Sequence, residues 1–178
     1  MRLIDLTQKF SAEEFSSNPH SGTHVDSPAY LFPGGKKIDE FKLERFLTEG
    51  VLLDLTEKKF GQPIDDEDLE AAEEAAGLAL REQEAVILHV SSRVRLSRNG
   101  AEYLEFRGLA LVGINSVSID GGESGGMEAH RVLLSKDILV LEGLTHLDSI
   151  DSSRFRLASF PMRLDGAIAP VRAVAMLE

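Results

Sequence analysis

Short apolar runs separated by polar turns recur along the whole chain. Their lengths and alternation predict β-strands at 2–7, 50–55, 84–90, 137–143, 154–162 and 167–177, and a further strand within 109–120. Residues 38–47 place apolar side chains at mixed spacing, which is typical of a helical turn or an irregular segment. Helical patterns are found at 65–80, at 127–135 and, as a short helix or turn, at 99–106. Because strands and helices intermingle, the pattern favours an α/β or α+β fold with a mixed sheet.

The segment 65–80 has the clearest helical pattern. Asp65 or Asp66 can cap its first turn, where further carboxylates complement the helix dipole. A narrow apolar stripe runs through Leu69, Ala72, Ala76 and Leu80. Seven carboxylates lie between positions 65 and 74, and such a run usually forms a solvated outer face. We therefore expect no chemistry from this helix.

Composition narrows the classes of function. A chain of 178 residues is expected to form a single domain spanning residues 1–178. Its formal net charge of −11 repels phosphate backbones and anionic membranes, so neither nucleic acid nor membrane is an expected partner. The longest apolar runs are too short to span a bilayer, and the first residues lack a secretory pattern, so the cytoplasm is the expected compartment. Without cysteine, any metal must be bound by nitrogen and oxygen ligands.

Candidate chemistry is concentrated in the stretch NPHSGTHVDSP, residues 18–28. On an extended chain the side chains of His20, His24 and Asp26 point to the same face. His24 and Asp26 would be ~7 Å apart, within reach of one ion, but His20 would be ~13 Å from His24 on a flat strand. The chain must therefore bend, and Gly22 is the residue that can adopt an unusual φ at the bend.

Two histidines and a carboxylate with one open position form the ligand set of a hydrolytic metal site. This set suits Zn²⁺ and also Mn²⁺ or Fe²⁺. A bound divalent ion can lower the pKa of water from ~15.7 to ~7. The alternative interpretation is a strand and turn that carry histidines with no metal.

Other polar residues have more than one interpretation. His130 on a predicted helix and Glu142 at the end of a strand would ordinarily be structural or surface groups, and their spacing alone does not join them to the first cluster. His89 is expected to be a hydrogen-bonded core histidine. Four further residues have open alternatives between a site role and a structural role: Ser118 and Asp120 (orienting a ligand or capping a turn), His146 (replacement ligand or loop residue) and Arg172 (substrate clamp or ion pair).

Several motifs together resemble one known family. HSGTHVDSP is similar to the H-x-G-T-H-x-D-x-P signature of the cyclase family of metal-dependent hydrolases, which includes bacterial kynurenine formamidases and isatin hydrolases. LVGINSVSID resembles the family's G-x-D-x-x-S-x-D segment, and AHRVLLSKDILVLEGLTHLDSI resembles its A-H-x-x-L-L…E-x-L-x-N-L-D segment. DGAIAPVRAVAML is similar to its closing strand. The motifs occur in the family's order over most of the chain.

The resemblance implies a swivelling β/β/α-type α/β fold, with a barrel-like mixed sheet flanked by helices, in a homodimer. It implies that His20, His24 and Asp26 bind a first ion, Zn²⁺ or Mn²⁺, and that Asp26 bridges to a second ion held by His130 and Glu142. The implied reaction is hydrolysis of a small amide, formamide or lactam by metal-bound hydroxide, as in the arylformamidase step of tryptophan catabolism.

The chain departs from the family pattern at three places. Tyr30 stands where the family usually has a histidine that serves as a ligand or proton shuttle, so Tyr30 and His130 are the candidate catalytic side chains. The segment between the first strand and His20 is short, and HVSS at 89–92 and Asn115 replace the usual residues. These changes predict reduced activity, with a catalytically inactive relative that binds a metal or a small acid as the alternative.

Overall fold

The structure is a computed structural model that describes residues 1–9, 11, 13, 20–91, 93–122 and 126–178. Its strands are β1 (Arg2–Asp5), β2 (His24–Asp26), β3 (Leu47–Asp54), β4 (Pro63–Ile64), β5 (Ala85–His89), β6 (Arg95–Leu96), β7 (Leu111–Ile114), β8 (Leu139–Glu142), β9 (Arg154–Pro161) and β10 (Ile168–Leu177). Its α-helices are α2 (Asp66–Ala76), α3 (Arg98–Phe106) and α4 (Glu128–Leu134), and its 3-10 helices are η1 (Pro28–Tyr30), η2 (Ile38–Glu40), η3 (Leu43–Phe46) and η4 (Leu147–Ser149).

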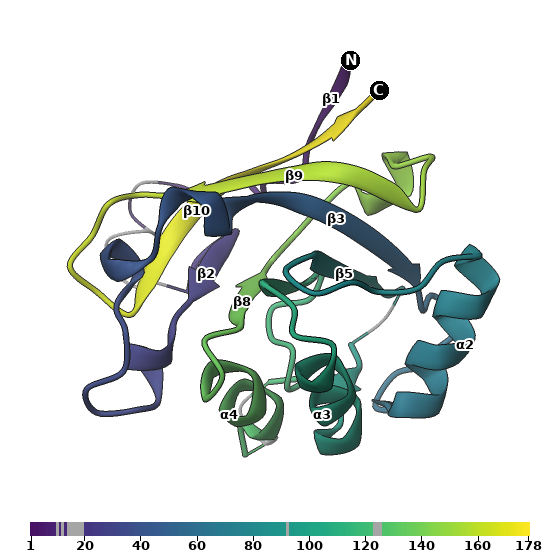
Figure 1. Ribbon diagram of the computed structural model, residues 1–178, viewed down its shortest axis with the longest axis horizontal. Helices are drawn as coiled ribbons and strands as arrows, with labels where there is room; N and C mark the ends of the chain where they lie inside the picture. The colour runs from purple at the N-terminus through teal and green to yellow at the C-terminus, as the bar shows by residue number, and fades with distance from the viewer. Residues whose placement is uncertain (10, 12, 14–19, 92, 123–125) are drawn as a thin grey trace.

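The main sheet closes into a barrel. Its strand order is β10-β2-β8-β7-β5-β3-β9, and β9 pairs with β10 to close the barrel. The start of β10 pairs with β2, and its end pairs with β1. Strands β3, β5, β7 and β8 are mutually parallel, and the pairings of β2, β9 and β10 are antiparallel. Helices α2, α3 and α4 lie together on one side of the parallel strands (Figure 1). The expected α/β fold with a barrel-like mixed sheet and flanking helices is thus confirmed.

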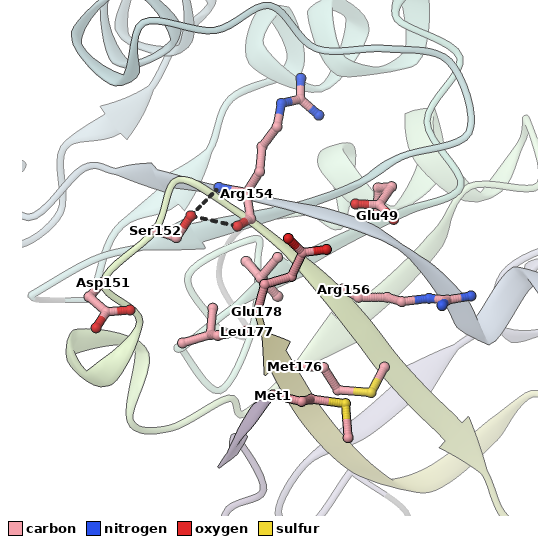
Figure 2. A pocket seen from close by; sticks show the side chains of 10 residues that line it. Met1, Glu49, Asp151, Ser152, Arg154, Arg156, Met176, Leu177 and Glu178 are labelled. Atoms are coloured by element: carbon pink, nitrogen blue, oxygen red, sulfur yellow. Dashed lines mark hydrogen bonds between the residues drawn. The ribbon is translucent and has the colours of Figure 1, made fainter.

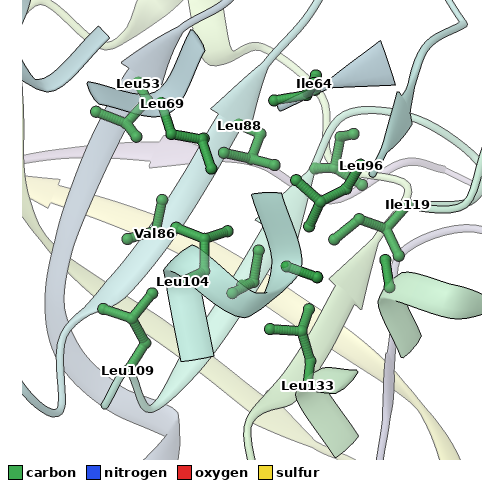
Figure 3. Close-up of a cluster of buried hydrophobic side chains, with 14 of the residues drawn as sticks. Leu53, Ile64, Leu69, Val86, Leu88, Leu96, Leu104, Leu109, Ile119 and Leu133 are labelled. Atoms are coloured by element: carbon green, nitrogen blue, oxygen red, sulfur yellow. The ribbon is translucent and has the colours of Figure 1, made fainter. Parts of the chain in front are cut away.

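Alternating side chains of the strands supply two separate cores. Along β5, Ala85 and Ile87 pack inside the barrel, whereas Val86 and Leu88 pack beneath the helices. Figure 3 shows the second cluster, in which Leu104 of α3 faces Val86 and Leu88. A strand buried on both faces has an unbroken apolar sequence, as AVIL does.

The helix predicted at 65–80 is shorter in the structure. It ends at Ala76 because Gly77 takes the left-handed conformation at φ 65°, and its N–H bonds to the Glu73 and Glu74 carbonyls. Leu80 is still buried, but from the following loop. The expectation of a wholly solvated acidic face is wrong for Glu73, which is buried and accepts bonds from Tyr103 and from the backbone of Leu80.

The other predicted elements are present with shifted ends. The segment 38–47 forms the 3-10 helices η2 and η3, as its mixed spacing indicated. The strand expected within 109–120 is β7, which ends at Ile114, and the residues that follow it form a loop. Part of the glycine-rich turn at 120–126, and most of the short segment before His20, lie outside the described residues. Within the described ranges, no helix is long and apolar enough to cross a membrane.

Gly100 in α3 offers a test of the packing between this helix and the small β4–β6 sheet. A Cβ atom on Gly100 would lie 2.6 Å from the carbonyl oxygen of Ile64, which is backbone and cannot turn away. Helix propensity favours alanine over glycine, but the overlap outweighs it. We expect Gly100→Ala to lower the free energy of unfolding by about 1–3 kcal/mol in urea titrations. The exposed Asn99→Ala is the control, and a Gly100→Ala protein more stable than wild type would contradict this packing.

Candidate metal centre

The pairing of β2 with β8 brings distant parts of the chain together. His24 lies directly opposite Glu142 in the antiparallel register. Val25 and its partner Leu141 point into the barrel, so His24, Asp26 and Glu142 share the opposite face. All three side chains are almost wholly buried, and Asp26 is 0% exposed. The register therefore places two carboxylates and an imidazole in one buried space.

His20 joins this group through a bend in the chain. Gly22 has φ 69°, as the predicted bend requires. The bend brings His20 Nδ1 to 3.1 Å from His24 Nε2, and each of these nitrogens lies 3.9 Å from Asp26 Oδ1. His24 Nδ1 lies 3.0 Å from the carbonyl oxygen of Gly22. A proton on Nδ1, donated to that carbonyl, leaves the Nε2 lone pair directed at the carboxylates.

His130 approaches the same carboxylates from helix α4. Its Nε2 lies 3.2 Å from Asp26 Oδ2 and 3.3 Å from Glu142 Oε1. Its Nδ1 bonds to Asp120 Oδ2, and Asp120 also accepts bonds from the backbone N–H groups of Ala129 and His130. Asp120 thus performs both roles left open by the sequence: it holds the first turn of α4 and it orients the imidazole of His130.

The four ligand atoms nearest one another belong to His20, His24, Asp26 and Glu142, and all lie within 4.8 Å of one another. Asp26 Oδ1 is buried and has no hydrogen-bond partner in the described residues. A buried carboxylate oxygen without a partner is costly unless a cation or proton satisfies it. Nitrogen and oxygen donors at this spacing fit a divalent cation such as Zn²⁺ or Mn²⁺.

The electrostatics of the cluster favour positive charge. Burial alone would lower the pKa of His130, but hydrogen bonds to Asp120 and Asp26 outweigh it and raise the pKa to about 10. For His24, burial is likewise outweighed by the bond to Glu142 and the charge on Asp26, so its pKa is raised. At His20, which is half-buried, desolvation prevails and lowers the pKa. These shifts favour protons on His24 and His130 where three carboxylates converge, and a divalent cation would compete with those protons.

Tyr30 lies at the edge of the cluster. Its ring centroid is 5.0 Å from that of His20 and 5.9 Å from that of His130. Burial, followed by the charges on nearby carboxylates, raises its pKa, so the phenol keeps its proton at neutral pH. The phenol can therefore donate a hydrogen bond. No contact among the described residues supports the expectation of reduced activity.

Four other residues prove to lie outside the cluster. Arg172 forms a two-pronged ion pair with Asp5, which is the structural alternative for this arginine. His146 is exposed, and its Nδ1 lies 3.0 Å from the Asp5 carbonyl, so it is a loop residue. His89 was expected in the core but is only half-buried, because it is the last residue of β5. Asn115 exchanges two hydrogen bonds with the backbone of Val90.

A separate hollow of ≈ 580 Å³ lies against β9 and the end of β10 (Figure 2). Its lining includes Glu49, Asp151, Arg156 and Glu178 but none of the histidines or carboxylates described above. The hollow therefore does not extend the cluster.

The sequence patterns did not reveal two contributors to the cluster. The backbone N–H of Ile119 donates to Glu142 Oε1 at 2.7 Å. Thr23, which lies between His20 and His24 in the sequence, is fully buried. Its hydroxyl donates a hydrogen bond to the carbonyl oxygen of Gly143, the residue after Glu142. In the sequence, only the place of Thr23 within HSGTHVD pointed to a role in the cluster. Its bond to Gly143 could not be inferred without knowing that β2 pairs with β8.

Comparisons with known protein sequences show which family the chain resembles. The family model "Putative cyclase" matches residues 4–121. The kynurenine formamidase of Erythrobacter litoralis is 30% identical over 175 residues, covering 96% of this chain and 79% of that protein. The kynurenine formamidase of Bordetella pertussis is 32% identical over 171 residues, covering 92% and 79% respectively.

Solved structures share the whole fold. Isatin hydrolase A from Labrenzia aggregata superposes with a TM-score of 0.80 at 17% identity, covering 99% of this chain and 93% of that one. A potential metal-dependent hydrolase with cyclase activity superposes with a TM-score of 0.79 at 20% identity, covering 98% and 96%. The closed mixed barrel with flanking helices is thus shared with solved structures over almost the whole chain. The chain belongs to the cyclase family, and it is kynurenine formamidase-like within that family.

Asp120 provides a test of how the cluster is supported. Asp120→Ala leaves the buried N–H groups of Ala129 and His130 without an acceptor, so we expect the free energy of unfolding to fall by about 1–3 kcal/mol. It also releases the imidazole of His130, so cation affinity should fall ~10- to 100-fold. Urea unfolding and metal-chelator competition measure the two effects. Asp65→Ala, at the start of α2, is the matched control: equal loss of cation affinity in both variants would contradict the role of Asp120.

Proposed function

We propose that this protein is a metal-dependent hydrolase that cleaves a small amide, formamide or lactam. The observation that carries this proposal is the cluster of half-buried His20 with buried His24, Asp26 and Glu142, in which one carboxylate oxygen has no hydrogen-bond partner among the described residues. The names of the relatives support a formamide, since several are kynurenine formamidases, and an isatin hydrolase shares the fold. Isatin is a lactam, so both names describe attack by water on a carbonyl bonded to nitrogen.

His20, His24, Asp26 and Glu142 would hold the cation, with Zn²⁺ or Mn²⁺ as the candidates. A bound divalent cation supplies a Lewis acid that polarises a carbonyl and lowers the pKa of water. His24 is preset for this role because its Nδ1 faces the Gly22 carbonyl, which leaves Nε2 for the cation. Asp26 and Glu142 each direct one oxygen toward His24 and the other toward His130.

His130 would serve as the fifth ligand or move a proton. Hydrolysis forms a bond from the water oxygen to the carbonyl carbon and breaks the carbon–nitrogen bond, and the leaving nitrogen must gain a proton. His130 Nε2 would deliver that proton to the leaving nitrogen and take up the proton released by the attacking water; the bond from its Nδ1 to Asp120, which fixes the ring, supports this role. Tyr30 would donate a hydrogen bond to the carbonyl oxygen as negative charge develops on it.

The homodimeric state and the cytoplasmic location expected from the sequence remain predictions. Assays of the purified protein with different cations and acyl substrates would identify the native metal, the number of ions and the substrate. The alternative function, binding of a metal or a small acid without turnover, is separated from the hydrolase by the same assays.

Cation loading and hydrolysis test the proposal together. Chelator-treated protein should regain hydrolysis of N-formylkynurenine or of a simple lactam when Zn²⁺ or Mn²⁺ is added, and its melting temperature should rise with cation binding. Glu142→Gln keeps the shape and the bond from Ile119 but loses the charge, so activity should fall at least ~100-fold. The exposed Glu128→Gln is the control. Loaded wild-type protein that cleaves none of these substrates would rule out the hydrolase.

Tyr30→Phe tests the phenol. The ring contacts to His20 and His130 are retained while the hydroxyl is lost, so kcat should fall ~100-fold or more with little change in KM. Tyr103→Phe removes the hydroxyl of the chain's other tyrosine, which bonds to Glu73, and should affect stability alone. Steady-state kinetics of both variants make the comparison. An unchanged kcat in Tyr30→Phe would show that the phenol takes no part in the reaction.

A further inference from the structure

Thr23 lies between His20 and His24 in the sequence, and the two hydrogen bonds that the structure records for its hydroxyl go to backbone groups rather than to ligand atoms. Its side chain is 0% exposed. The hydroxyl donates to the carbonyl oxygen of Gly143 at 2.7 Å and accepts from the backbone N–H of Gln8 at 2.7 Å. One buried hydroxyl therefore joins three segments: the chain after β1, the start of β2 and the turn after β8.

Two of these segments carry the cation ligands. Thr23 immediately precedes His24, and Gly143 immediately follows Glu142. The bond from Thr23 to Gly143 therefore crosses between β2 and β8 one position beyond the pair His24–Glu142. This bond therefore ties the two strands together where the ligands face one another.

The backbone at this crossing has little room. Gly143 has φ 69°, and a Cβ atom there would lie 2.4 Å from the carbonyl oxygen of Gly22. That same carbonyl lies 3.0 Å from His24 Nδ1. The Thr23 hydroxyl thus holds Gly143 against the bend whose carbonyl orients His24. The ring of His24 and the carboxylate of Glu142 are fixed by one tightly packed crossing.

We propose that Thr23 is a positioning residue for the cation site, which sets the spacing between His24 and Glu142 through its bond to Gly143. This inference rests on the proposed metal-dependent function. The backbone carbonyl of Thr23 accepts a hydrogen bond from Val171 N–H at 3.0 Å, so the main chain stays anchored when the hydroxyl is removed. The hydroxyl acts on the two ligands, whereas the backbone bond holds the strand.

Thr23→Val and Thr23→Ser separate the hydroxyl from the shape of the side chain. Valine keeps the volume and loses both hydroxyl bonds, whereas serine keeps the hydroxyl and loses a methyl group. We expect Thr23→Val to raise the dissociation constant for Zn²⁺ ~10- to 100-fold, the usual effect of removing a group that orients a ligand. The visible absorption bands of bound Co²⁺ should shift, because they report the geometry of the ligands. Thr23→Ser should restore both properties to nearly the wild-type values.

Thr7→Val is the matched control. The Thr7 hydroxyl also bonds two backbone groups, the carbonyl and the N–H of Ala173, but these bonds join the chain after β1 to β10 and involve no residue of β2 or β8. Both valine variants should lose stability, and only Thr23→Val should change the affinity and the Co²⁺ spectrum. A Thr23→Val protein with wild-type affinity and spectrum would overturn the positioning role while leaving the proposed function intact. Wild-type protein that binds no Zn²⁺ or Co²⁺ would overturn both.

Discussion

The cluster depends on the antiparallel pairing of a three-residue strand, β2, with the end of β8. A shift of one residue would turn His24 and Asp26 into the barrel and bring Val25 out. Val25, Leu141 and Ala169 fill the barrel at this level, so burial of these apolar side chains fixes the register. The apolar core thereby determines where the polar ligands lie, and the barrel is the support for the chemistry.

The cost of this arrangement is electrostatic. Asp26, Asp120 and Glu142 are buried together, and burying charge is unfavourable unless partners compensate it. Backbone N–H groups and His130 compensate most of the oxygens, but Asp26 Oδ1 has no partner in the described part of the chain. A divalent cation would remove this imbalance. Under the proposed function, cation binding would offset the cost of burying these carboxylates, and folding would be coupled to cation binding.

The sequence predicted the classes of element and the central residues of the cluster, but not their connections. The bend at Gly22 could be derived from the distance that separates His20 from His24 on a straight strand. The end of α2 at Gly77 was missed because apolar periodicity continues to Leu80, although the helix does not. Joining His130 and Glu142 to the first histidines required the family resemblance, because no local pattern encodes the pairing of β2 with β8. The support from Thr23 and Ile119 arises only from that pairing.

Diffraction data collected above and below the zinc absorption edge, from crystals grown without chelator and supplied with Zn²⁺, would locate the cation directly. We predict an anomalous peak ~2.0–2.2 Å from Asp26 Oδ1 and from the facing nitrogens of His20 and His24. A peak elsewhere on the molecule, with these imidazoles turned away from Asp26, would contradict the account.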